Sequence, residues 1–329
     1  MELEKTFITE KNEKSKEKIS KRNISVLLSF SVLFLLAILP IISNSRPSNL
    51  NALNYTFYLS LWQLVCSIPF FFYESTILKK GIFQKSLDHK IRNKTLKIMG
   101  ITGIIFSIST FLYVFAIETA GTVSGSIAME TYPLFSIFME FFIFRKKRRK
   151  IEIFFTLIII AGIYYLGTKG TWLFSDFSIW FGVALIVPFL WSIAHVVLKN
   201  TIDTSPITPS QITFIRVLIS FAVLFGISSL VNGIDIVLEG LMNPEFQIFG
   251  FLMGLVYYLE LINWFYAVKH IEVSVASSIT TPAPLFTMIF ALFMLKESIE
   301  VYMIITMIMV FASLYGLLWA GNRKKSGSK

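Results

Sequence analysis

Residues 264–296 read WFYAVKHIEVSVASSITTPAPLFTMIFALFMLK, and residues 113–145 read YVFAIETAGTVSGSIAMETYPLFSIFMEFFIFR. The two stretches align without a gap when the chain is shifted by 151 residues. The identical pairs are Ala116 with Ala267, Ser126 with Ser277, Phe142 with Phe293, and Pro-Leu-Phe at 133–135 with the same tripeptide at 284–286. Most other pairs are apolar on apolar, so the chain contains an internal repeat.

Both copies lie in apolar runs of a chain that is 55% hydrophobic and only 15% charged. A soluble domain is about a quarter charged, so the low charge points to a membrane protein. A spanning helix needs roughly 20 predominantly apolar residues, whereas a spanning strand alternates over about ten. Ten helical spans are predicted, at 24–43, 53–73, 98–118, 122–144, 151–168, 177–198, 210–231, 246–268, 273–295 and 301–321.

The two aligned stretches contain the fourth and the ninth predicted spans, which are five spans apart. Because five is odd, the two copies run through the bilayer in opposite directions. The predicted fold is therefore an all-α polytopic membrane protein of ten transmembrane helices in two inverted five-helix repeats, an arrangement typical of secondary transporters. The expected units are a disordered cytoplasmic tail (1–23), the repeats (24–168 and 177–321) and a C-terminal cytoplasmic tail (322–329).

Lysine and arginine are distributed unequally between the two sides of this predicted topology. With a cytoplasmic N-terminus, 26 of them fall in cytoplasmic segments and three on the other side, while Arg216 lies within a span. Cytoplasmic loops are the positively charged ones, so both termini are expected in the cytoplasm of a multi-pass cell-membrane protein. The basic run RKKRRK at 145–150 then reads as a lipid-headgroup anchor and not as a nucleic-acid patch.

The segment 265–299 resembles the ten-helix EamA-like members of the drug/metabolite transporter superfamily. The matching residues are Tyr266, Ala267, Pro284 and Glu297, together with Arg216 early in the seventh helix. The first half departs from that pattern at Gln63, where the second helix often has an arginine, and at 145–150, where the family has a short turn with a Glu. The resemblance implies a central cavity lined mainly by helices 1, 3, 4, 6, 8 and 9.

Two acids are predicted to lie within spans, where a carboxylate is costly unless it faces a cavity or a partner. Glu130 precedes Pro133 by one turn, as its repeat equivalent Thr281 precedes Pro284. Both can line the cavity, although Glu130 can instead pair with a hydroxyl or with Arg216 inside the bundle.

Glu260 belongs to a stripe of the eighth span with polar and aromatic members at helical spacing. The stripe consists of Tyr257, Glu260, Asn263 and Trp264, and the equivalent stripe of the third span consists of Ser109 and Tyr113. A carboxylate, an amide and aromatic rings suit an amphipathic substrate with an amine or a ring. Packing between helices is the alternative explanation of the same pattern.

Three further features complete the candidate residues. His195 and Arg216 can line the cavity or form ion pairs, and a histidine titrates near neutral pH. Pro133, Pro282 and Pro284 are hinge candidates, because proline frees a helical carbonyl. Gly250 and Gly254 have the spacing that allows close helix approach.

The sequence favours a secondary transporter, an exporter or exchanger, of small metabolites such as amino acids or related amphipathic compounds. No phosphate-binding loop, metal-ligand cluster or nucleophile–base arrangement appears, so no enzyme activity, cofactor or metal is expected. The expected partners are a small-molecule substrate, a coupling proton or counter-substrate, and the lipid bilayer. A membrane-embedded enzyme and a non-transporting receptor or scaffold are the alternatives. Substrate identity, direction of transport, coupling ion and oligomeric state do not follow from the sequence.

Overall fold

The structure is a computed structural model that describes residues 2–84, 86–132, 134–135, 138–139, 150–271 and 273–326. Every regular element of these residues is helical, which confirms the predicted all-α class. The long helices are α1 (Glu2–Asn44), α2 (Ala52–Phe72), α3 (His89–Ala120), α6 (Lys150–Gly167), α7 (Ile179–Thr204), α8 (Pro209–Asn232), α10 (Pro244–His270) and α13 (Val301–Ser326). The short ones are α4 (Thr122–Met129), α9 (Ile234–Leu241), α11 (Val273–Thr280) and α12 (Ala283–Phe290), and single π-helical turns follow α2 (η1, Tyr73–Ile77) and α12 (η4, Ala291–Leu295).

Polar caps and prolines define where several of these helices begin. The Asn51 side chain accepts a hydrogen bond from the Asn54 amide at 2.9 Å and starts α2. Thr208 and Asn243 cap α8 and α10 in the same way, and Pro209 and Pro244 follow them. A side-chain acceptor followed by proline is a strong helix-start signal, because the first amides have no partner within the helix.

Six helices of the described residues are long and apolar enough to cross a membrane, so the protein is multi-pass. These candidate spans are Ser20–Asn44, Ala52–Ile77, His89–Ala120, Ile179–Thr204, Pro209–Asn232 and Pro244–His270. Shorter apolar helices occupy Ile153–Gly167, Ala283–Leu295 and Val301–Leu317. The predicted fourth and ninth spans do not form single uninterrupted helices among the described residues.

The interruptions fall at equivalent positions of the two repeats. A shift of 151 residues carries both ends of α4 onto the ends of α11. After α11, Pro282 lacks the amide hydrogen that would continue the helix, and α12 restarts at Ala283. Pro282 and Pro284 therefore lie at a real break in the backbone, whereas Pro133, the third hinge candidate, lies outside the described residues, as does most of the basic run 145–150.

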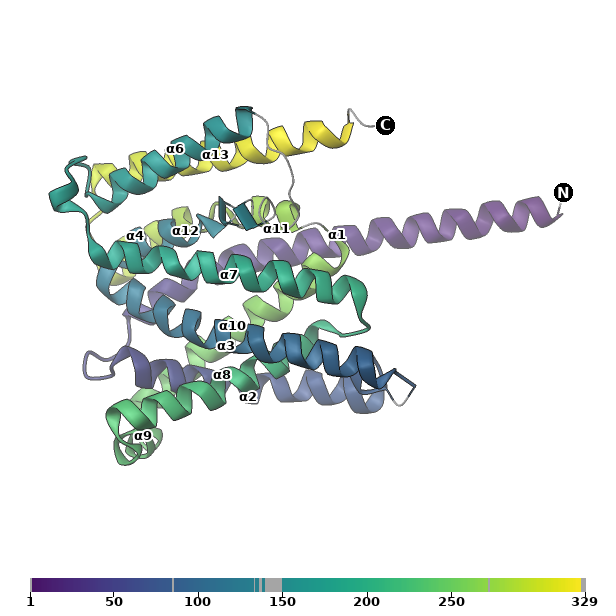
Figure 1. Ribbon diagram of the computed structural model, residues 1–329, viewed down its shortest axis with the longest axis horizontal. Coiled ribbons are helices and arrows are strands. Elements are labelled where there is room, and N and C mark those ends of the chain that lie inside the picture. The colour runs from purple at the N-terminus through teal and green to yellow at the C-terminus, as the bar shows by residue number, and fades with distance from the viewer. Residues whose placement is uncertain are drawn as a thin grey trace.

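The helices pack in pairs that relate the two halves of the chain (Figure 1). Helix α6 lies along α13 at one edge of the bundle, and α2 packs against α8 toward the opposite edge. Between them α1 packs against α10 and α12, α3 packs against α7, and α4 packs against α7 and α12. Exchanging α1 with α7, α2 with α8, α3 with α10, α4 with α11–α12 and α6 with α13 leaves this set of contacts unchanged. The two halves are thus packed as equivalents.

Helix α1 continues in the N-terminal direction to Glu2, through residues that the sequence analysis assigns to a disordered tail. Residues 1–23 contain no glycine or proline and are rich in lysine and glutamate, which are good helix formers. The helix can therefore extend beyond its apolar part, which begins at Ile24.

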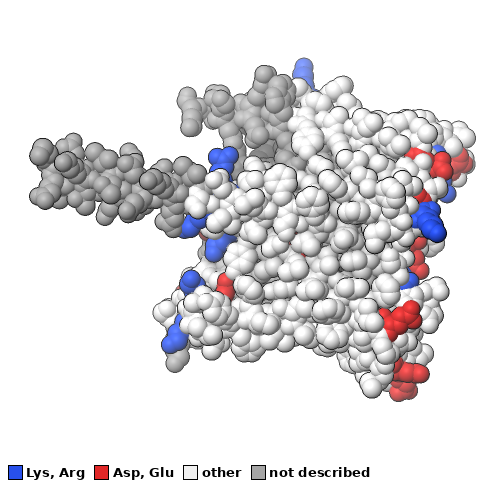
Figure 2. Space-filling view, turned by 180° about the vertical axis from the view of Figure 1, so that it is seen from behind, with Lys and Arg blue, Asp and Glu red and all other residues white. Residues whose placement is uncertain are grey.

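On the face shown in Figure 2, the charged side chains lie at the two ends of the bundle and leave an uncharged belt between them. In Figure 2, Lys and Arg gather at one end, and most Asp and Glu lie at the other end with a few Lys and Arg. An uncharged belt between charged ends is expected of a surface that faces lipid tails.

Candidate functional site

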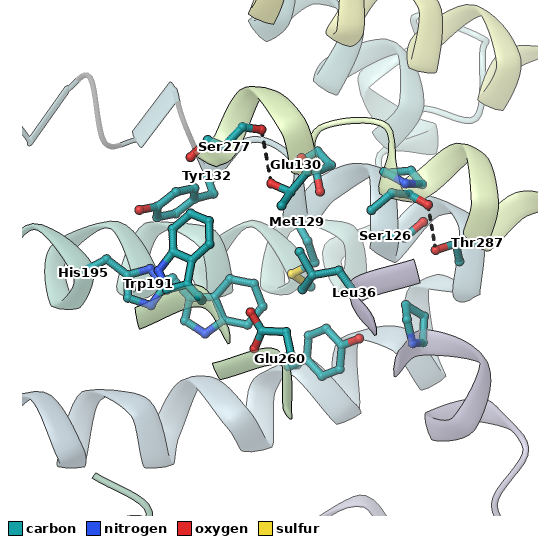
Figure 3. Close-up of a pocket in the computed structure, with 16 residues that line it drawn as sticks. Leu36, Ser126, Met129, Glu130, Tyr132, Trp191, His195, Glu260, Ser277 and Thr287 are labelled. Carbon is teal, nitrogen blue, oxygen red and sulfur yellow. Dashed lines mark hydrogen bonds between the residues drawn. The ribbon is translucent and has the colours of Figure 1, made fainter. Parts of the chain in front are cut away.

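A central cavity of about 70 Å³ lies between α1, α3, α4, α7, α10, α11 and α12 (Figure 3). Counted as predicted spans, these helices are the first, third, fourth, sixth, eighth and ninth, the set that the family resemblance implies. Metabolite-binding pockets usually measure about 300–1,000 Å³, so this conformation is contracted around its cavity.

The cavity is lined by residues that are equivalent in the two repeats. Each pair is separated by the repeat offset of 151 residues, and both members contact the cavity. The pairs are Tyr113 with Trp264, Ser126 with Ser277, Met129 with Thr280, and Tyr132 with Ala283. The cavity therefore lies at the interface of the two halves, where repeat-built transporters place their substrate site.

Two carboxyl groups reach this cavity from different halves of the chain. Glu260 projects from the middle of α10 and is 7% exposed, and Glu130 follows the last residue of α4. Figure 3 shows the two side chains on opposite walls. Within the described part of the chain, neither carboxyl group accepts a side-chain hydrogen bond or forms an ion pair. Such groups are expensive to bury, so their position favours contact with a ligand or a proton.

Aromatic rings form a continuous wall around His195. The ring of His195 lies 5.5 Å from Tyr132 and 5.7 Å from Trp264, measured between centroids. Tyr113 stacks on Trp191 at 5.8 Å. Three buried ring nitrogens lack a hydrogen-bond partner among the described residues. They are Nδ1 and Nε2 of His195 and Nε1 of Trp191. Buried polar atoms are normally paired, so unpaired ones at a cavity point to a bound group.

Arg216 lies behind the cavity wall and not on it. Its guanidinium Cζ is 3.5 Å from the centroid of the Phe106 ring and 5.9 Å from that of Tyr257. The residue is 2% exposed. It is close enough for its charge to act on Glu260, but no ion pair within 4 Å joins it to either cavity carboxylate in the described residues. The alternative explanation of Glu130 as an ion-pair partner of Arg216 is thus not observed.

The remaining candidates lie outside the cavity lining. Tyr257 packs behind it against the Tyr113 ring at 6.3 Å. Asn263 donates a hydrogen bond to Ser31 of α1 at 3.0 Å. Ser109 and Thr281 donate to backbone carbonyls of their own helices. The structure therefore brings together six candidates, namely Glu130, Glu260, Trp264, Tyr113, His195 and Pro284.

Sequence reasoning missed several lining residues. These are Leu36, Pro40, Ser126, Met129, Tyr132, Trp191, Ser277, Thr280, Ala283 and Thr287. One signal could have found the serines, because Ser126 and Ser277 are an identical pair of the repeat close to Glu130 and Thr281. Leu36 and Pro40 of α1 are ordinary apolar span residues and give no such signal.

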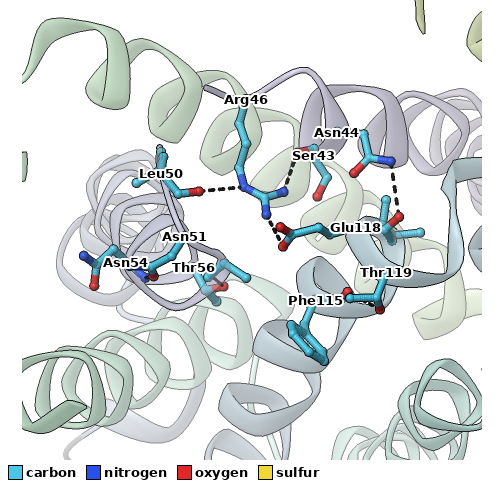
Figure 4. A network of polar contacts seen from close by, with 12 residues as sticks. Ser43, Asn44, Arg46, Leu50, Asn51, Asn54, Thr56, Phe115, Glu118 and Thr119 are labelled. Atoms are coloured by element: carbon cyan, nitrogen blue, oxygen red, sulfur yellow. Dashed lines mark hydrogen bonds and ion pairs between the residues drawn. The ribbon is translucent and has the colours of Figure 1, made fainter. Parts of the chain in front are cut away.

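Polar contacts join the end of α1 and the residues after it to α3 and α4 (Figure 4). Arg46 Nη2 forms an ion pair with Glu118 Oε2 at 2.5 Å, and Arg46 Nη1 donates to the Ser43 carbonyl at 2.8 Å. The Asn44 amide donates to the Ile117 carbonyl at 3.2 Å and to Thr122 Oγ1 at 2.7 Å. These contacts hold the end of α1 against the α3–α4 junction.

In the second half, polar contacts join the end of α7 to α10. Lys199 Nζ, near the end of α7, donates to the Val268 carbonyl of α10 at 2.9 Å and pairs with Asp203 at the same distance. Beside it, Glu74 accepts hydrogen bonds from Ser210 and from Tyr266, the latter at 2.5 Å. The ends of α1 and α7, the first helices of the two halves, are therefore both held by polar contacts in this conformation.

A multi-pass helical bundle of two packed halves, with a cavity that contains two carboxyl groups at their interface, is the architecture of a membrane transporter. The model of the EamA-like transporter family matches residues 23–168 and 178–319. The chain belongs to the EamA-like transporter family, as the resemblance in residues 265–299 predicted, and its family indicates a membrane transporter of the drug/metabolite type.

A solved crystal structure, described only as "Crystal structure of protein", has the same fold. It superposes with a TM-score of 0.60 over 89% of this chain and 97% of its own, at 14% sequence identity. No curated protein matches the sequence.

Proposed function

We propose that the protein is a secondary transporter that moves small metabolites by alternating access through the central cavity. The observation that carries this proposal is the lining of one buried cavity by repeat-equivalent residues such as Ser126 and Ser277. A site shared by two equivalent halves can be reached from either side when one half moves against the other.

The proposal includes ten spans in two inverted repeats, with both termini in the cytoplasm of a cell-membrane protein. The exchange symmetry of the helix contacts supports a two-fold relation, and an odd number of spans in each half supports an axis near the membrane plane. The distribution of lysine and arginine supports the orientation, with 26 on the proposed cytoplasmic side and three on the other.

The contracted cavity supports a cycle with a closed state and two open states. Its volume of about 70 Å³ must increase before a metabolite can enter. The breaks between α11 and α12 and after α4 are the proposed hinges, with Pro282 and Pro284 at the first of them. Because these breaks lie beside the cavity, a small rotation there widens it without unfolding a helix.

Glu260 is the proposed contact for substrate or for a coupling proton. It is buried, lies midway along α10, and lines the cavity without a hydrogen-bonding partner among the described residues. A carboxyl group in that position gains most from binding a proton or a donor group of the substrate.

The test is untargeted metabolite profiling of cells with and without the protein, followed by uptake in proteoliposomes across an imposed proton gradient. The expected result is one class of metabolite whose level changes and whose uptake requires the protein and is lost in Trp264→Ala. A metabolite profile that does not change contradicts the proposed function, and so does a changed profile in which no changed metabolite is taken up by the proteoliposomes.

A further inference from the structure

When Glu130 and Glu260 are both ionised, the charges around the central cavity do not balance. Glu130 and Glu260 line it, and no lysine or arginine of the described residues does. Arg216, behind the wall, compensates one negative charge. Burying a second carboxylate without a positive partner is costly, so the cavity has room for one more positive charge.

Three hydroxyl groups of the lining already use their hydrogens within the protein. Ser126 donates to the Val123 carbonyl at 2.8 Å, Thr280 to the Ser277 carbonyl at 3.1 Å, and Thr287 to the Ala37 carbonyl at 2.9 Å. These oxygens can therefore present only lone pairs to the cavity. Together with the carboxyl oxygens they give the cavity acceptors from both halves of the chain, which suit a donor, beside the unpaired ring nitrogens of Trp191 and His195.

The aromatic rings of the lining also favour a positively charged ligand. Trp264, Trp191, Tyr113 and Tyr132 line the cavity, and the face of an aromatic ring attracts a cation within about 6 Å. The same rings provide apolar area for a hydrocarbon body. The guanidinium of Arg216 lies over the Phe106 ring at 3.5 Å and does not line the cavity, so it offers no anion site there.

We infer that the substrate of this transporter is an organic monocation, an ammonium group on an apolar or aromatic body, held between Glu130, Glu260 and the tryptophan and tyrosine rings. This inference rests on the proposed transport function and specifies its substrate class. The ammonium group supplies the missing positive charge and the hydrogen-bond donors, and the rings contact the body.

The test uses three probes with the same ring and different charge. They are 2-phenylethylamine, which is a cation at neutral pH, phenylacetate, and neutral 2-phenylethanol. Binding to the purified full-length protein is measured by titration calorimetry, and exchange is measured in proteoliposomes loaded with each labelled probe. The cation is expected to bind about tenfold or more tightly than either other probe.

Variants identify the residues responsible for that preference. Glu260→Gln and Glu130→Gln keep the shape of the side chain and are each expected to reduce the preference for the cation to about threefold or less. Glu245→Gln is the matched control, because Glu245 is an exposed acid in the first turn of the same helix as Glu260. Its preference should equal that of the wild type, and thermal unfolding confirms that all variants are folded.

The inference is overturned if phenylacetate or 2-phenylethanol binds as tightly as 2-phenylethylamine or more tightly, or if 2-phenylethylamine does not bind. It is also overturned if the preference for the cation is unchanged in both Glu260→Gln and Glu130→Gln. If phenylacetate or 2-phenylethanol is exchanged, and Trp264→Ala abolishes that exchange, the transport function is supported and the cationic substrate class is contradicted. Binding of the cation with no exchange in proteoliposomes would instead contradict the transport function and retain the charge preference.

Discussion

The backbone carbonyls of Ile117 and Val268, 151 residues apart, each accept a hydrogen bond from the first helix of their own repeat. Asn44 donates to Ile117 at 3.2 Å, and Lys199 donates to Val268 at 2.9 Å. The two acceptors are equivalent positions of the two repeats, near the ends of α3 and α10. In the proposed cycle each stabilises closure of one end, so their balance sets which open state is more populated.

Loss of one of these contacts should favour opening at its own end. A single hydrogen bond contributes roughly 1 kcal/mol, so Asn44→Ala should increase amide exchange at the end of α3, and Lys199→Ala should increase it at the end of α10. Hydrogen exchange with mass spectrometry measures both ends in one experiment. In the double variant, the ratio of amide exchange at the end of α3 to that at the end of α10 should return toward the wild-type value. A double variant with the exchange ratio of either single variant would contradict the proposed balance between the two contacts.

Removing the charge of Glu260 should change transport without unfolding the protein. Glu260→Gln keeps shape and polarity but cannot titrate, so transport should become slower or lose its dependence on pH. Glu260→Ala should in addition weaken substrate binding, because it removes the acceptor. Uptake is measured across a series of pH values, and a wild-type rate and pH profile in both folded variants would reduce Glu260 to a structural polar group and direct attention to Glu130.

Close packing of α10 against α2 should make Gly254 intolerant of a side chain. A Cβ at Gly254 would lie 2.7 Å from the Leu59 carbonyl oxygen and 2.9 Å from the Gln63 amide nitrogen, which are backbone atoms that cannot rotate away. Gly254→Ala should cost about 1–3 kcal/mol of stability. Gly226→Ala is the control, because a Cβ there meets nothing within 4 Å. Equal melting temperatures for the two variants would refute this packing.

The orientation of the chain is a separate prediction. Reporter fusions after residue 326 should behave as cytoplasmic, and a tag inserted between Lys169 and Asp176 should be accessible from outside intact cells. The basis is the positive-inside rule applied to the 26 and three charges of the two sides. An external C-terminus would mean that a span has been miscounted, with 151–168 the first candidate.

The repeat offset, read from sequence, predicted more of the site than any single motif did. Equivalent positions of two repeats lie at equivalent places around a two-fold axis. Residues near Pro284 and near its repeat equivalent, Pro133, are therefore expected to lie at the same cavity. Tyr113 and Trp264 illustrate this, because they belong to equivalent stripes of the third and the eighth span and line the same cavity. Apolar runs also predicted the long helices, since about 20 apolar residues have few other stable arrangements in lipid.

The sequence could not separate the members of the α10 stripe. Successive helical residues turn by about 100°, so Asn263 and Trp264 lie on either side of Glu260 by about 60° and 40°. Which of them faces the cavity depends on neighbouring helices, and Ser31 of α1 takes Asn263 away from it. The hydrogen bonds to the Ile117 and Val268 carbonyls could not be predicted from the sequence either, because each joins residues about 70 positions apart through a backbone carbonyl.

The central claim, a single site reached alternately from both sides, is tested most directly by thiol labelling of Ser126→Cys and Ser277→Cys, each in a Cys66→Ser background. A membrane-impermeant thiol reagent is applied from one side and then from the other to oriented vesicles. Both positions are expected to react from both sides, and adding Asn44→Ala is expected to speed labelling from the α1 end and to slow it from the other. Labelling from one side only, unaffected by Asn44→Ala, would contradict it.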